Sequence, residues 1–471
     1  MCLRLRPAVT SRADLLLSPI VLAAFVWKII CSMKINIDIV RPLIFSALIA
    51  TGFLTSLRAQ EVLIPDPNLS TAIHEALGKP AGPLTQQDML GLTGLSAIFR
   101  NITNVSGLEA AQNLVSLDVQ DNHITNVNLL TNLTRLVFLD LSENQFPQLT
   151  IPSGMTNLTT LRAELGGLTN ITLPAGLTKL TSLRLGFNQL PSLTLPADMT
   201  NLSLLSVYLN QLTNLTLPPT LTSLTNLNLD GNRLSSLNLP AGMTKMDTVI
   251  ASANQLTSCT VPAEMTNLKF LRLNNNQLTS VSLPAGLTNL MGLYLNSNQL
   301  TNLTLPPDLN HLTQAELGQN NLTNLILSAG LTSLSFLNLT DNQLTNLTLP
   351  PDAQQLIGLF VGGNPLTTFV LSETLATTGM ASVVDSLRNQ GIPVFTYPLV
   401  VQLGRPLMLI GSFKFSITGP PGVYTVLGST NLTDWSPVGI ATNPLGSVNF
   451  HDVTTNVLPQ RFYRVLLQVH P

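Results

Sequence analysis

The chain has 471 residues, of which 45% are apolar, 10% are charged and only 5% are aromatic. Seven of the 22 basic and two of the 24 acidic residues lie in residues 1–59, so the rest carries 15 against 22, a net charge of about −7. An acidic chain of this kind is a poor partner for nucleic acid or for an anionic membrane.

The first 59 residues predict a leader rather than part of a fold. Met33 precedes two basic residues and an apolar run at 43–54, and Ala59 ends a candidate cleavage site, a combination typical of secretory signal peptides. We therefore expect translation to start at Met33 and the mature chain to begin near Gln60. A second apolar run, at 15–27, leaves a membrane anchor as the alternative, although this run is short for crossing a bilayer.

Residues 60–91 predict a helical N-terminal cap. Asp66 can cap a helix that has Pro67 in its first turn, and Gly78 can end it. A second short helix is expected after Thr85. A repeat array needs such a cap, because its first turn would otherwise expose apolar side chains and an open strand edge.

Residues 92–373 follow a 22-residue period without insertion or deletion, as in Leu268–Asn289, which reads LKFLRLNNNQLTSVSLPAGLTN. The apolar frame is L-x-x-L-x-L-x-x-N-x-L, and a fixed period of this length indicates a solenoid. One column, stepped by 22 over thirteen turns, is broken only by Arg100 and Gly166. Its other members are Asn122, Asn144, Asn188, Asn210, Asn232, Asn254, Asn276, Asn298, Asn320, Asn342 and Asn364.

The spacing within each turn predicts which side chains are buried. In an extended segment Leu271 and Leu273 share one side, while Phe270 and Arg272 point outward. One turn cannot bury its own leucines, but stacked turns can. A ladder of Asn amides can satisfy backbone groups that would otherwise be buried without partners.

The second half of each turn predicts a short strand on an outer wall. Leu193 and Leu195 alternate with polar residues, Leu215 and Leu217 do so one turn later, and nine turns then place Pro in one column. Because Pro lacks an N–H group, it is tolerated only just beyond a strand ladder. We expect a flattened coil with little or no helix on this wall.

On these residues, the chain resembles the leucine-rich repeat proteins, specifically the 22-residue bacterial type of internalin-like proteins. The resemblance covers about residues 92–373. It implies a β-rich solenoid of about thirteen turns and a non-enzymatic protein whose concave face binds another macromolecule outside the cell.

The C-terminal residues predict two further parts. Apolar residues at helical spacing up to Leu387, followed by a strand at 392–395, indicate an α/β C-terminal cap over 374–397. Five short apolar runs separated by turns predict a small all-β sandwich over 398–471. Several of its segments, such as 429–435, resemble a C-terminal module of large secreted bacterial proteins, which could be a spacer, a surface attachment or a secretion tail.

No catalytic, cofactor or metal site is predicted. The five histidines lack metal-ligand spacing, and Cys259, which is alone in the mature chain, lies in an inward column. Asp118 and Asp140 occupy the same outward column of adjacent turns, which permits acid–base chemistry or weak Ca²⁺ binding as alternatives. Neither a nucleophile nor a pocket accompanies them.

Outward columns of stacked turns predict where a partner binds. Aromatic and Arg side chains anchor interfaces, and this chain, poor in both, concentrates them on one wall. The expected contacts form two patches: Arg162, Arg184, Phe187 and Tyr208, and then Phe270, Arg272 and Tyr294. In the alternative interpretation, Asp140 and Arg162 form an exposed ion pair and the aromatic rings merely cover the sheet.

The sequence thus predicts a secreted or cell-surface, monomeric binding protein for an extracellular protein or glycan, with no membrane insertion of the mature chain. The alternative is a structural surface or matrix protein whose regular Thr and Asn faces associate with cell wall or carbohydrate.

Overall fold

The structure is a computed structural model that describes residues 60–127, 131–409, 412–453 and 460–468. The predicted leader, residues 1–59, lies outside the described residues. All helices and strands named here belong to one compact unit, Val62–Pro471.

The two helices predicted for the N-terminal cap are present. Helix α3 (Pro67–Leu77) begins at Asp66, whose carboxylate accepts hydrogen bonds from two backbone N–H groups, and ends at Gly78 with φ 61°. Helix α4 (Gln86–Gly91) begins at Thr85, which forms a reciprocal capping box with Asp88. Helix α3 packs on the first strand of the repeat sheet, so the first turn is covered.

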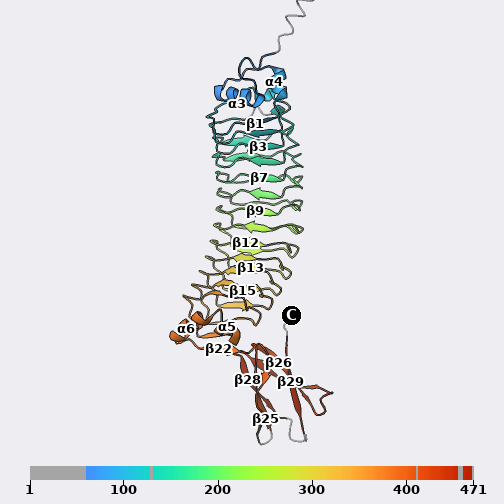
Figure 1. Cartoon of the computed structure of the whole chain (residues 1–471), viewed down its shortest axis with the longest axis vertical. Coiled ribbons are helices and arrows are strands. Elements are labelled where there is room, and N and C mark those ends of the chain that lie inside the picture. The colour runs from blue at the N-terminus through green and yellow to red at the C-terminus, as the bar shows by residue number, and fades with distance from the viewer. Residues whose placement is uncertain (1–59, 128–130, 410–411, 454–459, 469–471) are drawn as a thin grey trace, which may run out of the picture. The chain divides into compact units, whose positions relative to one another are not determined.

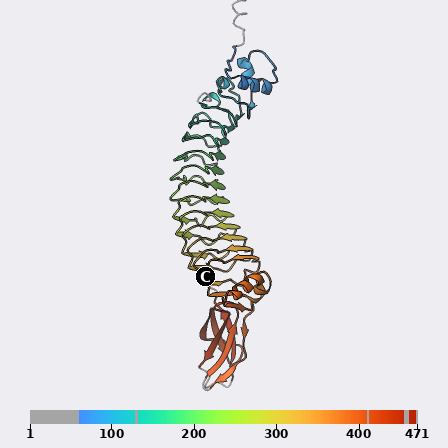
Figure 2. The same ribbon diagram turned by 90° about the vertical axis from the view of Figure 1, so that its left-hand side faces the viewer.

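The repeats form a thirteen-stranded parallel sheet, the main sheet, in which strands are stacked in chain order (Figure 1). Each residue pairs with the residue 22 positions later, as Leu205 does with Leu227. The strands are β1 (Gly94–Ser96), β2 (Ser116–Asp118), β3 (Phe138–Asp140), β5 (Thr160–Arg162), β7 (Ser182–Arg184), β8 (Leu204–Ser206), β9 (Asn226–Asn228), β10 (Thr248–Ile250), β12 (Phe270–Arg272), β14 (Gly292–Tyr294), β16 (Gln314–Glu316), β18 (Phe336–Asn338) and β20 (Gly358–Phe360). They lie on one side of each turn (Figure 2).

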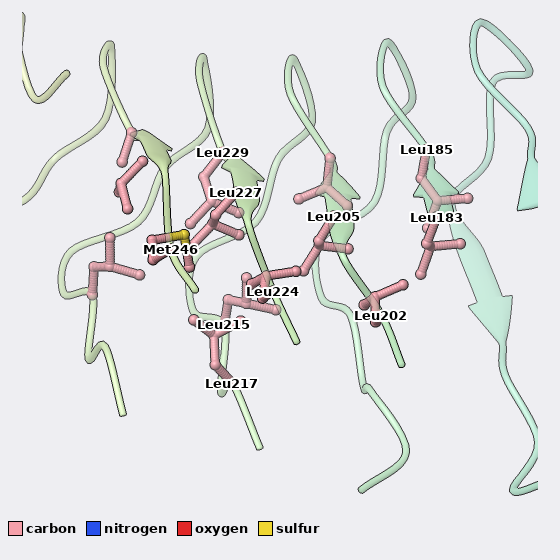
Figure 3. Close-up of a cluster of buried hydrophobic side chains, with 14 of the residues drawn as sticks. Leu183, Leu185, Leu202, Leu205, Leu215, Leu217, Leu224, Leu227, Leu229 and Met246 are labelled. Atoms are coloured by element: carbon pink, nitrogen blue, oxygen red, sulfur yellow. The ribbon is translucent and has the colours of Figure 1, made fainter. Parts of the chain in front are cut away.

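The leucines of the frame form one continuous apolar core, as predicted. Leu271 and Leu273 have no exposed surface, whereas Arg272 between them is exposed. Figure 3 shows leucines of the main sheet, such as Leu205, and of the outer wall, such as Leu215, filling the space between the two walls. Apolar burial of this extent is the main stabilising contribution to the fold.

The Asn column forms the predicted ladder, and each amide connects successive turns. The side-chain oxygen of Asn232 accepts a hydrogen bond from the N–H of Leu212 at 3.0 Å. Its amide nitrogen donates to the carbonyls of Val207 in the preceding turn and Leu229 in its own turn, both at 3.0 Å. The residue before each ladder Asn has positive φ even where it is not Gly, as in Phe187 with φ 55°. Leu165, before the break at Gly166, adopts the same conformation with φ 56°. Because this conformation is costly for side chains other than Gly, it is set by the stacking of the turns and not by local preference.

One of the two breaks in the ladder is filled by an aromatic ring. Gly166 stands where a ladder Asn is expected, and a Cβ atom built on it would lie 3.7 Å from the ring of Phe146. Phe146 is fully buried and occupies a position that holds Leu in most turns, as at Leu168 and Leu190. The larger ring thus packs in the space left by the absent amide.

The outer wall was predicted correctly only in part. Paired strands occur as β4 (Gln148–Thr150) with β6 (Asn170–Thr172), β11 (Ser258–Thr260) with β13 (Ser280–Ser282), β15 (Asn302–Leu305) with β17 (Asn324–Leu327), and β19 (Asn346–Thr348) with β21 (Thr368–Ser372) and β22 (Val394–Tyr397).

The segments around Leu193, Leu195, Leu215 and Leu217 are not strands, although all four side chains are buried as the alternation predicts. Burial of alternate side chains therefore holds these segments in place without a regular ladder. In the described residues the repeats contain no α-helix on this wall, as expected. A 3₁₀ turn, Leu108–Ala110, lies in the first repeat.

The C-terminal end of the repeats carries the predicted helix α6 (Ala381–Asn389) and, in addition, helix α5 (Glu373–Thr377), which was not predicted. Ser372 caps α5 by accepting a hydrogen bond from the N–H of Leu375 at 3.2 Å. Strand β22 extends the outer wall by one further parallel strand, and its buried Tyr397 donates a hydrogen bond to the carbonyl of Leu349 at 2.8 Å.

The last residues form two antiparallel sheets. One contains β23 (Gln402–Leu403), β24 (Leu407–Leu409), β25 (Ser412–Thr418) and β28 (Ser447–Asp452); the other contains β26 (Gly422–Ser429), β27 (Ser436–Asn443) and β29 (Phe462–Leu467). All five predicted strands are present. Side chains of both sheets, such as Phe415 and Tyr424, share a small apolar core.

Candidate interaction surface

The solvent-exposed side of the main sheet, here called the sheet face, is built from the first and third residues of each strand. Because the middle Leu points into the core, its two neighbours point outward, and the 22-residue register aligns them in columns. One such column, the third-position column, runs through Asp140, Arg162, Arg184, Ser206 and Asn228 on adjacent strands.

The first predicted patch is only partly assembled. Arg162 and Arg184 are neighbours on β5 and β7, and the rings of Phe187 and Tyr208 meet edge to face at 5.1 Å between centroids. Arg162, however, turns away from these rings. Its guanidinium lies over the ring of Phe138, 5.5 Å from the centroid. Arg162 therefore joins the preceding turns, and the patch reduces to Arg184 with the two aromatic rings.

The ion pair considered at Asp140 is not a simple exposed one. Its carboxylate lies 3.5 Å from the guanidinium of Arg162, but the Asp140 side chain is only 3% exposed, against 39% for its partner. Asp140 also accepts a hydrogen bond from the backbone N–H of Ser142 at 3.0 Å. The description as a fully exposed pair is thus wrong for the acidic partner, which is buried.

The second predicted patch is compact. The guanidinium of Arg272 lies over the ring of Tyr294, 4.7 Å from the centroid, and the Tyr294 hydroxyl donates to the side-chain oxygen of Gln314 at 3.1 Å. Phe270 and Tyr294 both lean over Gly292, since a Cβ atom there would lie 3.0 and 2.8 Å from their rings. Arg272 is exposed, and the two rings are partly buried.

The carboxylates near the first patch are affected by their surroundings. Burial raises the pKa of Asp118, and the charge of Asp140 raises it further. Burial also raises the pKa of Glu164, against the opposing effect of Arg184. Within the described residues no group of three or more His, Cys, Asp or Glu side chains is arranged to hold a metal ion.

Residues missed by the sequence analysis shape both patches. Tyr208 lies across Gly186, where a Cβ atom would come within 2.1 Å of its ring, so Gly186 and Gly292 are needed for the rings to lie against the sheet. Between the patches is a hollow of about 210 Å³, with the short side chain of Ser206 and Asn228 in its lining. The signal for it was in the sequence, as Ser206, Asn228 and Ile250, three residues shorter than Arg, in the third-position column between Arg184 and Arg272.

Cys259 is a buried thiol and not part of this surface. It is 2% exposed in the core, and burial raises its pKa to about 12. Such a thiol is inert as a nucleophile, because the thiolate is the reactive form.

The comparisons with known proteins agree with this architecture. Residues 142–254 match the family described as BspA type leucine rich repeat region, and residues 266–311 match the family of leucine rich repeats. The fold, the register and these matches together define a leucine-rich repeat protein.

The repeats are related to those of the Listeria internalins. A segment of 71 residues is 38% identical to internalin H of Listeria monocytogenes, a match that spans 15% of this chain and 13% of that protein. The crystal structure of the Listeria monocytogenes internalin InlF superposes with a TM-score of 0.51 and 26% identity, over 66% of this chain and 94% of that one. The functional domain of InlJ, which includes a cysteine ladder, has a TM-score of 0.52 at 18% identity, over 76% and 95%, and supports the fold alone.

No helix in the described part of the chain has the length and hydropathy needed to cross a membrane.

Proposed function

We propose that this protein is a non-enzymatic binding protein, exported from the cell, that holds a macromolecular partner on the sheet face, the face expected to be concave. The observation that carries the proposal is that Arg and aromatic side chains pack against aromatic rings on this face: Arg272 lies on Tyr294, and Phe187 lies against Tyr208. Residues of these types contribute most to binding energy when a partner covers them. A leucine-rich repeat fold is typical of protein–protein interaction, which makes a protein the preferred partner.

The proposed contacts are Arg184, Phe187 and Tyr208 in the first patch and Phe270, Arg272 and Tyr294 in the second. Phe187 is 44% exposed, so a partner can bury a substantial part of its ring. Arg272 and Tyr294 are already held together, so little side-chain freedom is lost when a partner binds them. Arg162 stays in the proposal as a flanking residue, since its side chain is 39% exposed beside Arg184.

A binding measurement tests this proposal. The chain is immobilised and exposed to solubilised extracellular and surface proteins, and retained proteins are quantified by mass spectrometry. Tyr294→Ala and Phe187→Ala should each reduce retention of the same protein by about tenfold, equivalent to about 1.4 kcal/mol, without lowering the melting temperature. Phe395→Ala is the matched control, because Phe395 is similarly exposed but lies on β22 of the outer wall. Equal retention by all variants would exclude the sheet face.

Export is part of the proposal and rests on the leader at 1–59. N-terminal sequencing of the protein recovered from the medium should begin near Gln60, after initiation at Met33. Recovery of the apolar segment at 15–27 with the membrane fraction would support an anchor instead.

The C-terminal module is proposed to be a β-sandwich that acts as a spacer or attachment element. Support comes from its two sheets with a shared core and from a second buried cluster, in which Asp452 accepts hydrogen bonds from Arg461 at 2.7 Å and Tyr463 at 2.8 Å. Removing residues 398–471 should leave partner binding intact but abolish retention on the surface if the module attaches the protein.

A second candidate function is a structural protein that associates with cell wall or carbohydrate. The outer wall favours it, because outward residues such as Asn302, Thr304 and Thr348 form exposed columns without charge. Retention of the Tyr294→Ala variant on purified cell wall, at the level of the unchanged protein, would support this candidate over the first.

A further inference from the structure

The third-position column satisfies its polar side chains by pairing them along the stack, except over one stretch. Asp140 pairs with Arg162 at 3.5 Å. Farther on, the amide of Asn338 donates to the carboxylate of Glu316 at 2.9 Å, and Arg272 lies on the ring of Tyr294. Each of these contacts joins adjacent turns, so internal pairing between neighbours is a recurring arrangement in this column.

Three consecutive members of the same column depart from this arrangement. Arg184, Ser206 and Asn228 are register partners on β7, β8 and β9. Among the described residues, no side-chain hydrogen bond or ion pair is made by the Arg184 guanidinium, and its Nε is buried without a partner. The Ser206 hydroxyl and the Asn228 amide nitrogen likewise make no hydrogen bond there, although the Asn228 oxygen accepts one from the N–H of Asp230 at 3.1 Å.

These three side chains line the same hollow of about 210 Å³. Arg184 supplies N–H donors only, and Ser206 and Asn228 supply an O–H and an N–H donor. The Arg184 Nε is a buried donor, and buried donors are nearly always paired in folded proteins. A hollow lined by this donor and by two further donors that make no hydrogen bond among the described residues is chemically matched to an acceptor. Ile250 and Leu204 add apolar surface beside the donors, which suits a short aliphatic stem that carries the acceptor group.

We propose that this hollow receives a single Asp or Glu side chain of a protein partner, with its carboxylate held by the Arg184 guanidinium and by the donors of Ser206 and Asn228. The planar guanidinium favours a carboxylate because its parallel N–H groups match the two oxygens. The inference rests on the proposed function, and it specifies which chemical group the partner inserts between the two patches.

The surrounding charges restrict the ligand to one acidic group. Two carboxylates lie on turns at or next to the hollow: Glu164 on the turn before Arg184, and Asp230 on the turn of Asn228. A polyanion such as a sulfated glycan would bring further negative charge against both carboxylates, and like charges repel. A lone carboxylate directed at Arg184 meets less of this repulsion than a polyanion, because it brings one negative charge and places it against the guanidinium.

A peptide double-mutant cycle tests the inference. Random 12-residue peptides displayed on phage are selected on the full chain, and the selected peptides are synthesised with each Asp or Glu replaced by Asn or Gln. Arg184→Gln should weaken peptide binding about tenfold, the amide peptide should lose a similar factor, and the two changes together should lose little more than either alone. Arg184→Lys should lose a smaller factor, because it keeps the charge without the bidentate geometry.

The controls separate this inference from the proposed function. Arg233→Gln removes an exposed guanidinium that does not line the hollow, so it should leave binding unchanged. If peptides are weakened by Tyr294→Ala but bind the Arg184→Gln variant as tightly as the unchanged chain, the carboxylate site is wrong and the sheet face stands. If no selected peptide is affected by any of these substitutions, both proposals fail. Melting temperatures of all variants exclude loss of folding as the cause.

Discussion

Substitution of one ladder residue should destabilise the solenoid by an amount that the contacts define. In Asn232→Ala, the N–H of Leu212 loses its acceptor in a buried position. The three carbonyls that accept from Asn232 keep other partners. Val207 still accepts from Asn210 at 3.1 Å, Leu229 from Asn254 at 3.0 Å, and Asp230 from the N–H of Leu209 at 2.7 Å.

The expected cost follows from this asymmetry. One orphaned buried donor costs about 1 to 3 kcal/mol, and each of the two shorter redundant bonds contributes about 0.5 to 1.5 kcal/mol net, so we expect a total of about 2 to 6 kcal/mol. Asn364→Ala is the matched control. Asn364 makes the same set of bonds, with Leu344, Leu339 and Val361, but it is only partly buried, so water can replace the amide.

The assay must report local stability, because long repeat arrays can lose two-state behaviour. Urea unfolding gives the overall loss, and hydrogen exchange followed by mass spectrometry gives the protection of the peptide that contains Leu212. That peptide should exchange faster in Asn232→Ala, with little change three or more turns away. Equal destabilisation by the two Asn variants, or unchanged exchange at Leu212, would refute the reasoning.

Other predictions concern the core, the ladder break and the N-terminal cap. Leu273→Ala should cost about 2 to 5 kcal/mol, since Leu273 is fully buried, and a melting shift no larger than that of the exposed Thr279→Ala would contradict this. Gly166→Asn alone should destabilise the solenoid by crowding Phe146, and adding Phe146→Leu should recover stability in urea unfolding because the amide ladder is then restored. If the losses of the two substitutions simply add, the ladder is not restored. Hydrogen bonds and a lysine lower the pKa of Asp88 from 3.8 to about 2, so its contribution is present above about pH 4 and is lost as pH falls towards about 2. In Asp88→Asn, the free energy of unfolding should change less between about pH 4 and pH 2 than in the unchanged chain. The same pH dependence in both proteins would show that the Asp88 carboxylate does not contribute.

The sequence was sufficient for the frame because the frame is repeated. Thirteen copies of one pattern are enough to predict that Leu271 points into the core and Arg272 points outward, and the ladder follows from one Asn column. The caps followed from local signals, namely Asp66 and Gly78 at the ends of α3. Helix α5 was missed because it is five residues long, too short to show a period.

The surface was less predictable, since it depends on side-chain direction. Sequence placed Arg162 correctly on an outward column, but not its rotation toward Phe138 and Asp140. Nor does the column order specify that Asp140, on the same outward column, is buried. Nor does a column reveal that Tyr208 lies over Gly186, a contact that exists only once adjacent turns are stacked.

The register has a consequence for how such a chain can change its length. Ladder contacts of Asn232 join residues 20 and 25 positions apart, as with Leu212 and Val207, and strand pairs are 22 apart. Gene duplication or deletion of one whole 22-residue unit would therefore restore the contacts across the junction, whereas loss of 21 residues would shift those contacts out of register. The distance between Arg184 and Arg272 is set in whole turns of about 5 Å each. Unequal recombination could thus adjust the spacing of two contact points on a partner in fixed steps, with no redesign of the core.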